Sequence, residues 1–362
     1  MTSKIESISI VSAQGDYGVS FHNTISDLNE KIVKKEDTYF LVDKIVWEIY
    51  GKNLDFVNKN NLLLLNGDED TKTLSGVNHV IEWLNKNGAT KSSVLVAVGG
   101  GVIQDVTTFV SHVYYRGIKW EYIPTTLLSQ SDSCIGAKCG INVLSNKNQV
   151  GVLHSPSAVY IVEEFLGTLE KEEFESGFGE IFKLAVTGPN QFWEELKTHL
   201  KENKLNSEKV LPMTAKSLLA KKVIIEIDEY EKDLRRILNY GHSFGHSLET
   251  ITKNRISHGY AILFGMDLMN YLGVLWGITD RKFAEEFRGI IQEAFPKFKL
   301  EKIDVIELVN GLKKDKKVIS GKINFAIVEN VGKIVIVNRA IDKSLELEVE
   351  GYLSDVCKFY SP

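Results

Sequence analysis

Cysteines and long apolar segments are scarce in this sequence. Its 362 residues include three cysteines, Cys134, Cys139 and Cys357, an odd and sparse set that excludes a disulfide framework and suits a reducing compartment. No further cysteine or histidine pair lies near Cys134 and Cys139 at zinc spacing, so we interpret both as small buried side chains rather than metal thiolates. The N-terminal segment lacks the apolar core of a signal peptide, and no run of about 18 apolar residues could cross a membrane. We therefore expect a cytoplasmic protein without a membrane partner.

An excess of positive charge is also missing. Lysine and arginine total 43 against 48 acidic residues, which gives a net charge of -5. This balance gives no reason to expect nucleic acid or an anionic membrane as a partner, so an anionic ligand must be bound by a local cluster of basic residues. The length predicts two domains, and the 43% hydrophobic content provides a core of ordinary size.

Short apolar segments alternate with amphipathic ones in the first half of the chain. Residues 92–98 show no alternation and end in five apolar residues, which is typical of a strand covered on both faces in a parallel sheet. Strands that alternate with helices predict a doubly wound α/β domain. We expect strands at residues 38–43, 61–67, 92–98 and 118–126, and helices at 73–87 and 101–115.

The pattern becomes mainly helical from about Thr168. Strand patterning returns only at residues 323–337. We therefore expect an α/β nucleotide-binding domain at residues 1–167 and a mainly α-helical metal- and substrate-binding domain at residues 168–362. The expected helices lie at residues 169–186, 192–203, 211–227, 234–251, 261–277 and 281–295.

Two segments are candidates for binding a nucleotide. Gly99, Gly100 and Gly101 follow a predicted strand and open a predicted helix, so backbone N–H groups there could approach a pyrophosphate. The pattern is GGGxxxD and not GxGxxG, and a simple tight turn explains it equally well. The second segment, GDEDTK at residues 67–72, also fits a solvated charged loop.

Histidines and one glutamate form a candidate metal site. His242 and His246 are four residues apart and share a helix face, while His258 follows sixteen residues after His242. Glu180 lies three residues before Lys183 on another helix. Two histidines and one carboxylate are a usual catalytic zinc set. Spacing alone favours His242 and His246 as the pair, although ordinary hydrogen-bonded helix histidines would have the same spacing.

Basic residues recur beside polar ones in the central region. Arginine suits phosphate or carboxylate, and these residues could converge on one anion, although most basic residues of any chain are solvated. The candidates are Arg116, Lys138, Lys147, Lys183, Lys221, Arg235 and the pair Lys316 and Lys317.

Taken in order, several motifs resemble 3-dehydroquinate synthases, a family of sugar-phosphate cyclases. The resemblance spans about residues 40 to 330 and is specific, because separate motifs agree in order and spacing. It implies an NAD-binding α/β domain, a helical metal-binding domain, an active site in the cleft between them, and a homodimer. The motifs are GGGVIQD, YYRG, PTTLLSQSDSCIGAKCGIN, NKNQVG, ESGFGEIFK, LRRILNYGHSFGHSLE, SHGYAI and KKDKKVISGKINFAIV.

The resemblance also implies roles for individual residues. It assigns Glu180, His242 and His258 as metal ligands, so that His246 becomes a substrate-side residue, in contrast to the spacing argument. The implied substrate positions are Lys138, Asn148, Lys183, Lys221, Arg235, Asn239 and His246, with Arg116, Lys147 and Lys316 near the phosphate. The register of Lys316 and Lys317 stays open, and the arginine at 116 can serve the neighbouring subunit. The implied nucleotide positions are Asp43, Glu69, Lys72, Gly100, Gly101, Asp105, Thr125, Thr126, Asp132, Lys147, Phe165 and Thr168.

The implied reaction uses NAD and one divalent metal, zinc or cobalt. The substrate is a phosphorylated keto-acid sugar, 3-deoxy-arabino-heptulosonate 7-phosphate. Transient oxidation by NAD, phosphate elimination, re-reduction and an intramolecular aldol closure give 3-dehydroquinate. This is a step of the shikimate pathway to aromatic amino acids.

Some positions depart from the family pattern, and other activities stay open. Gln104 replaces a common Gly, residues 177–179 replace a smaller Ala-containing stretch, and Tyr230 and Asp233 stand where Arg and Gly are common. Sister cyclases would use glucose 6-phosphate, giving 2-deoxy-scyllo-inosose, or sedoheptulose 7-phosphate, giving valiolone-type products. A polyol dehydrogenase resembling glycerol dehydrogenase would produce net NADH, and a non-catalytic protein would bind neither metal nor NAD. The residues that favour the keto-acid substrate over the sister cyclases are Arg235, Asn239 and His246.

Overall fold

The computed structural model describes residues 7–32, 37–144, 146–253, 255–295, 300, 303–313 and 321–357. The chain divides into two compact units. The first comprises residues 1–170 and 207–222, and the second comprises residues 171–206 and 223–362. Within the described part of the chain, no helix has the length and apolar character to cross a bilayer. The domain boundary at residues 167/168 stays a prediction.

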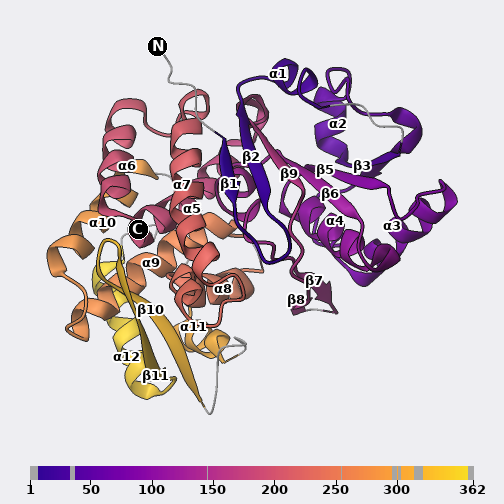
Figure 1. Cartoon of the computed structure of the whole chain (residues 1–362). Coiled ribbons are helices and arrows are strands. Elements are labelled where there is room, and N and C mark those ends of the chain that lie inside the picture. Colours follow the sequence, from indigo (N-terminus) through magenta and orange to yellow (C-terminus); the bar gives the residue numbers. More distant parts are fainter. Residues whose placement is uncertain are drawn as a thin grey trace. The chain divides into compact units, whose positions relative to one another are not determined.

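A seven-stranded sheet forms the centre of the first unit (Figure 1). All neighbouring strands are parallel except the first pair. Strand β5 is buried along its whole length, which explains its unbroken apolar sequence. The predicted α/β class is confirmed, although three strands, β1, β2 and β9, had not been predicted. In spatial order the strands are β1 (Ile8–Ile10), β2 (Tyr17–His22), β9 (Ala158–Val162), β6 (Lys119–Pro124), β5 (Val94–Gly99), β3 (Thr38–Asp43) and β4 (Leu62–Leu65).

Helices cover both faces of this sheet. One face forms an apolar core in which Leu28 and Tyr50 pack with Phe40, Val96 and Val98, and Figure 1 shows α2 and α4 on opposite sides. A short hairpin, exposed along its second strand, extends from the unit. The elements are α1 (Ile25–Asn29), α2 (Lys44–Tyr50), α3 (Leu74–Lys86), α4 (Gly101–Val113), the hairpin strands β7 (Ile141–Val143) and β8 (Asn146–Val150), and α7 (Leu211–Ile227) as far as residue 222.

The second unit is mainly helical, as predicted. Helix α9 (His258–Leu275) is buried along most of its length and contacts α5, α8 and α10. The antiparallel pair β10 (Lys322–Asn330) and β11 (Lys333–Ala340) corresponds to the predicted strand segment at 323–337. The other helices are α5 (Lys171–Thr187), α6 (Asn190–Asn203), α8 (His242–Ile251), α10 (Arg281–Ala294), α11 (Val305–Leu312) and α12 (Lys343–Gly351).

The predicted helix at residues 234–251 is wrong in one respect. The structure has a 3-10 turn at Leu234–Asn239 and begins α8 only at His242. Gly241 separates them with a φ of +79°, and a Cβ there would lie 2.5 Å from the Met266 Cγ atom. Left-handed backbone favours glycine, so the chain turns here and His242 becomes the first residue of a new helix.

Candidate active site

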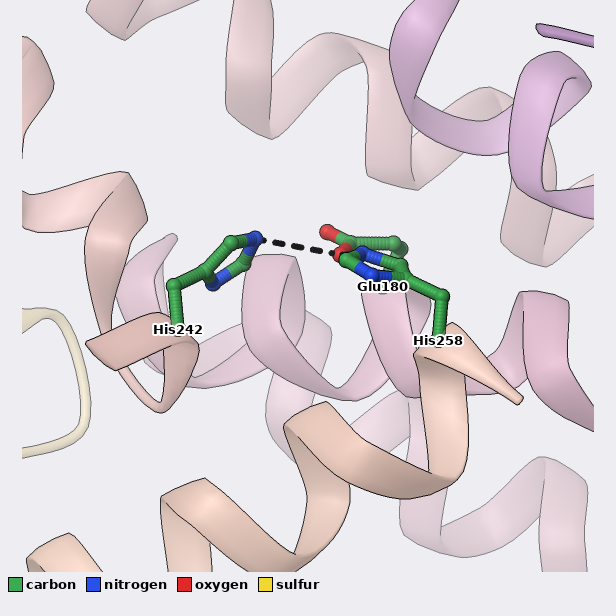
Figure 2. A group of neighbouring side chains, drawn as sticks. All are labelled: Glu180, His242 and His258. Carbon is green, nitrogen blue, oxygen red and sulfur yellow. Dashed lines mark hydrogen bonds and ion pairs between the residues drawn. The ribbon is translucent and has the colours of Figure 1, made fainter. Parts of the chain in front are cut away.

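Three side chains from three helices meet around one carboxylate oxygen (Figure 2). Glu180 lies in α5, while His242 and His258 are the first residues of α8 and α9. The Oε1 atom of Glu180 lies 3.4 Å from Nε2 of His242 and 3.0 Å from Nε2 of His258. The Glu180 side chain is 2% exposed, and a ligand atom from each residue lies within 4.8 Å of the others. This is the geometry of a group that can hold one metal ion.

Close backbone packing brings α5 and α9 together at this group. A Cβ at Gly179 would lie 2.5 Å from the Gly259 carbonyl oxygen, and one at Gly259 would lie 1.7 Å from the Ser176 carbonyl oxygen. Both positions therefore require glycine. Because Glu180 and His258 adjoin these glycines, the same contact sets their separation. It also gives a physical reason for the Gly at 179, where the family pattern carries a small Ala-containing stretch.

The outer ring nitrogens of both histidines already have acceptors. Nδ1 of His242 lies 3.1 Å from the Tyr240 carbonyl oxygen, and Nδ1 of His258 lies 3.3 Å from Oε1 of Glu249. Such partners favour a proton on Nδ1 and direct the Nε2 lone pair inward, which is the usual orientation of metal-ligating histidines. The donor set therefore fits a zinc- or cobalt-type ion.

The electrostatics of the group also suit a cation. Burial acts to raise the pKa of the Glu180 carboxyl, but its ion pair with Lys183 and the nearby His242 hold that pKa well below its usual range. Burial lowers the pKa of His242, which keeps it neutral and able to bind metal. Burial also acts to lower the pKa of His258, but hydrogen bonds to Glu180 and Glu249 outweigh it and raise the pKa to about 10. The two carboxylates thus favour a positive charge at His258, and a bound metal ion would take the place of the Nε2 proton.

His246 occupies a second, more exposed group. Its ring centroid lies 5.2 Å from that of His242 and 6.0 Å from that of His258. With Glu249 and His258 it forms another set whose ligand atoms lie within 4.8 Å of one another. The two histidines that spacing favoured thus divide between two sets that share His258.

Arg235 and Asn239, both predicted to contact substrate, lie in the turn before α8. The Arg235 side chain donates from Nη1 to the Glu229 carbonyl oxygen at 2.5 Å, and the Asn239 amide donates to Oε1 of Glu231 at 2.7 Å. Arg235 is buried and Asn239 half-buried. Both side chains are therefore fixed by the loop that precedes them.

In the first unit, the carboxyl ends of three adjacent strands carry predicted nucleotide residues. Asp43 ends β3, Gly100 follows β5, and Thr125 follows β6. Gly100 caps α4 without a side-chain hydrogen bond, and a Cβ at Gly101 would meet no heavy atom within 4 Å. The first turn of α4 thus offers N–H groups with room for an anion to approach, at the sheet edge where α/β folds bind nucleotides. Burial raises the pKa of Asp43, which also caps α2.

Other predicted nucleotide and substrate residues pair with one another. The Nζ atom of Lys72 lies 2.5 Å from Oδ2 of Asp105, and the Nζ atom of Lys221 lies 2.5 Å from Oδ1 of Asp132. All four side chains are largely buried. Glu69 accepts a hydrogen bond of 2.6 Å from the Asn142 amide. The charges in this region are therefore largely neutralised within the protein.

The remaining predicted residues differ in their surroundings. Lys138, Lys147 and Asn148 are exposed, and Lys147 lies 3.5 Å from Glu69. Thr126 bonds to Ser129, and Thr168 to Tyr50. The Phe165 side chain is buried in the sheet core, so its nucleotide role stays a prediction that only its backbone could fulfil. Lys316 and Lys317 lie outside the described residues.

Arg116 sits in a tightly turned loop. Tyr115, Arg116 and Gly117 have φ values of 49°, 61° and 113°. The Lys91 ammonium donates to the carbonyl oxygens of Tyr115 at 2.7 Å and Gly117 at 2.5 Å. These bonds hold the Arg116 backbone in left-handed conformation at the surface.

Gln104 makes a specific contact where the family pattern has glycine. Its amide nitrogen donates to the Ser133 carbonyl oxygen at 2.7 Å, and its amide oxygen accepts from the Ser133 hydroxyl at 2.6 Å. The substitution therefore joins α4 to the turn that carries Asp132. Tyr230 and Asp233 lie exposed in the loop before Arg235.

The sequence interpretation missed several residues. Glu249 had not been assigned, although it lies seven residues after His242 and therefore on the same face of α8. Asn142 lies in a quoted motif without an assigned role, yet its amide contacts Glu69 and its Oδ1 accepts from the Asn148 backbone at 3.0 Å. Asp228, whose carboxylate accepts backbone N–H groups of the loop that carries Arg235, had no sequence motif that would have marked it.

Comparison with known proteins identifies the family. The models for the 3-dehydroquinate synthase N-terminal and C-terminal regions match residues 62–176 and 177–318. The chain belongs to the 3-dehydroquinate synthase family. A 3-dehydroquinate synthase from Caldanaerobacter subterraneus subsp. tengcongensis is 33% identical over 87% of this chain and 90% of its own length. One from Campylobacter concisus is 39% identical over 75% of this chain and 77% of its own.

A solved structure confirms the fold of this family member. A 2-deoxy-scyllo-inosose synthase, complexed with carbaglucose-6-phosphate, NAD+ and Co2+, superposes with a TM-score of 0.83. The match covers 96% of this chain and 99% of that chain at 23% identity. The predicted fold class and family resemblance are therefore confirmed.

Proposed function

We propose that this chain converts 3-deoxy-arabino-heptulosonate 7-phosphate to 3-dehydroquinate and phosphate, with NAD and one divalent metal ion as cofactors. The observation that carries the proposal is the group of Glu180, His242 and His258, with its two outer ring nitrogens already partnered. It supports a metal centre inside the part of the chain that the C-terminal family model covers.

Glu180, His242 and His258 would hold the metal, and the turn at Gly100 would hold the nucleotide. When bound, the metal would acidify a coordinated hydroxyl, and NAD would accept a hydride and later return it. Lys183 keeps Glu180 ionised through their buried ion pair.

Arg235 supports a substrate that carries a carboxylate. Its planar guanidinium matches a carboxylate with two parallel hydrogen bonds, and its backbone is fixed by the preceding loop. Asn239 can donate to a hydroxyl, and a ring nitrogen of His246 can hold or pass a proton beside the substrate. Glucose 6-phosphate and sedoheptulose 7-phosphate lack the carboxylate, so we expect them to bind less well.

The first test is phosphate release by the purified protein with NAD and zinc. A dehydratase coupled to the assay converts 3-dehydroquinate to a product seen by absorbance. We expect phosphate and 3-dehydroquinate in equal amounts and no net NADH. Glucose 6-phosphate, sedoheptulose 7-phosphate and glycerol serve as parallel substrates.

Each other outcome points to a different activity. Cyclisation of glucose 6-phosphate or sedoheptulose 7-phosphate instead would assign a sister cyclase. Net NADH formation from glycerol would assign a polyol dehydrogenase. Folded protein that binds neither NAD nor zinc would contradict the catalytic proposal altogether.

We also propose a cytoplasmic homodimer. The three free cysteines agree with a reducing compartment. The exposed Arg116, held in its loop by Lys91, is presented in a way that would suit a role in the neighbouring subunit. Light scattering of the purified protein tests the assembly, and a mass of one chain would contradict it.

A further inference from the structure

Asp228 organises the loop between α7 and the turn that carries Arg235. It follows the last residue of α7. Its Oδ1 accepts the backbone N–H of Lys232 at 2.9 Å, and its Oδ2 accepts those of Asp233 at 2.8 Å and Arg235 at 3.0 Å. One carboxylate thus gathers three backbone donors of a single loop, and one donor belongs to Arg235 itself.

The same loop fixes two side chains proposed to bind substrate. Glu231 has a φ of 56°, a left-handed conformation that a non-glycine residue adopts only when its surroundings impose it. In this conformation its Oε1 accepts from the Asn239 amide. The Glu229 carbonyl oxygen accepts a hydrogen bond from Nη1 of Arg235. Loop backbone and substrate side chains are therefore one hydrogen-bonded unit with Asp228 at its base.

We propose that Asp228 is a positioning residue for Arg235 and Asn239. This inference rests on the proposed function, because it assumes that these two side chains bind the substrate. Asp228 does not itself touch the reacting atoms. Its carboxylate fixes the loop in advance, so that the guanidinium and the amide need not be ordered when substrate binds.

The carboxylate is suited to this task by its charge. Its slight burial acts to raise the pKa, but the three N–H donors and Arg235 outweigh it and lower the pKa below the usual value. Asp228 is therefore ionised at neutral pH. In Asp228→Asn one oxygen becomes an NH2 group that cannot accept, so at least one backbone donor loses its partner while the side-chain shape is kept.

The test compares Asp228→Asn with Asp342→Asn. Asp342 accepts the backbone N–H groups of Ser344 and Leu345 at 3.0 and 3.2 Å from an exposed position at the start of α12, and it has no proposed role in the reaction. It therefore controls for the general cost of removing such an acceptor.

Two readouts are needed, with metal content and NAD affinity as checks. Hydrogen–deuterium exchange reports the amides of residues 232, 233 and 235, with α9 amides as the reference for global opening. We expect exchange roughly tenfold faster in Asp228→Asn at this loop alone. We also expect the KM for 3-deoxy-arabino-heptulosonate 7-phosphate to rise roughly tenfold, with unchanged zinc content and NAD affinity.

The outcomes separate this inference from the proposed function. Unchanged exchange at residues 232–235 would overturn it, because the carboxylate would then not hold the loop. Faster exchange with an unchanged KM would also overturn it, since loop order would not affect substrate binding. An equal KM rise in Asp342→Asn would reveal a general effect of lost stability. If the unsubstituted protein released no phosphate from this substrate, the proposed function would fail, while the exchange result would still decide whether Asp228 orders the loop.

Discussion

The histidine group of the second unit and the nucleotide region of the first are built in different ways. In the former, Glu180, His242 and His258 converge on one carboxylate oxygen from three helices. In the latter, Lys72 forms an ion pair with Asp105 and Lys221 forms one with Asp132. Metal binding depends on the direction in which each ligand atom points. In the nucleotide region, by contrast, oppositely charged side chains already neutralise one another. A nucleotide must therefore rely mainly on backbone N–H groups or replace existing partners.

The largest effect is expected from removing a metal ligand. His258→Ala leaves two of the three proposed ligands and should weaken zinc or cobalt binding by more than about 100-fold, with loss of activity. This loss exceeds the roughly 10- to 100-fold effect of removing a residue that only hydrogen-bonds to a metal ligand. His246→Ala is the matched control, because it lies beside the same group but outside the proposed set. It should keep the metal. Both are measured by competition with a chelator, and equal metal loss in the two variants would instead favour the group of His246, Glu249 and His258.

The second largest effect is expected at the buried pair of Lys72 and Asp105. Asp105→Asn leaves the Lys72 ammonium buried without its counter-charge and should reduce the free energy of unfolding by about 3 kcal/mol. NAD affinity should fall, because Asp105 belongs to the predicted nucleotide region. Zinc affinity should stay unchanged, because the metal group lies in the other unit. Urea denaturation and calorimetric titration with NAD measure these quantities.

Two further variants separate stability from nucleotide binding. Glu329→Gln breaks an exposed pair with Lys333 and should cost less than about 1 kcal/mol. The double variant Lys72→Met, Asp105→Asn should recover part of the lost stability, because no unpaired buried charge remains. If the double variant bound NAD as well as the unsubstituted chain, the pair would be purely structural.

The third effect concerns the close contact between α5 and α9, which determines how far Glu180 lies from His258. Gly259→Ala places a Cβ where the Ser176 carbonyl oxygen lies, so α9 must shift, at a cost of about 3 kcal/mol and with weaker metal binding. Gly289→Ala in α10 is the control, since a Cβ there meets nothing within 4 Å. That variant should stabilise the helix by up to about 1 kcal/mol. Thermal unfolding measures both, and equal melting temperatures for the two would contradict the close packing.

Elements with a strong local pattern could be predicted from the sequence. Strand β5 is apolar on both faces, and the turn at Gly99–Gly101 joins it to α4, so both were found. Strand β2 was missed because its residues are of mixed polarity, and β9 because it is only five residues long and pairs with a strand more than 130 positions away. The break before α8 was missed because helical spacing continues through Gly241, and only its φ of +79° shows the turn.

The candidate site could be predicted only in part for a similar reason. Helical spacing correctly places His242 and His246 near each other, but it contains no information about how α5 meets α9. That meeting depends on Gly179 and Gly259, two residues whose importance lies in the atoms they lack. The family resemblance supplied Glu180 and His258 as ligands, and that assignment stays a proposal to be tested by the metal measurements above.

The smallest effect is expected at Glu249, which sharpens the account of the metal group itself. Its Oε1 lies within hydrogen-bond distance of Nδ1 of His258, the ring nitrogen that does not face Glu180. Glu249→Gln should therefore keep the fold and weaken metal binding by about 10- to 100-fold. Glu285→Gln, on the exposed side of α10, is the charge-matched control and should leave the affinity unchanged. Cobalt titration gives the stoichiometry as well as the affinity. One ion per chain in both proteins would make Glu249 an outer partner of a single metal. Two ions in the unsubstituted chain and one in Glu249→Gln would make it a ligand, with His246 and the shared His258 completing a second site.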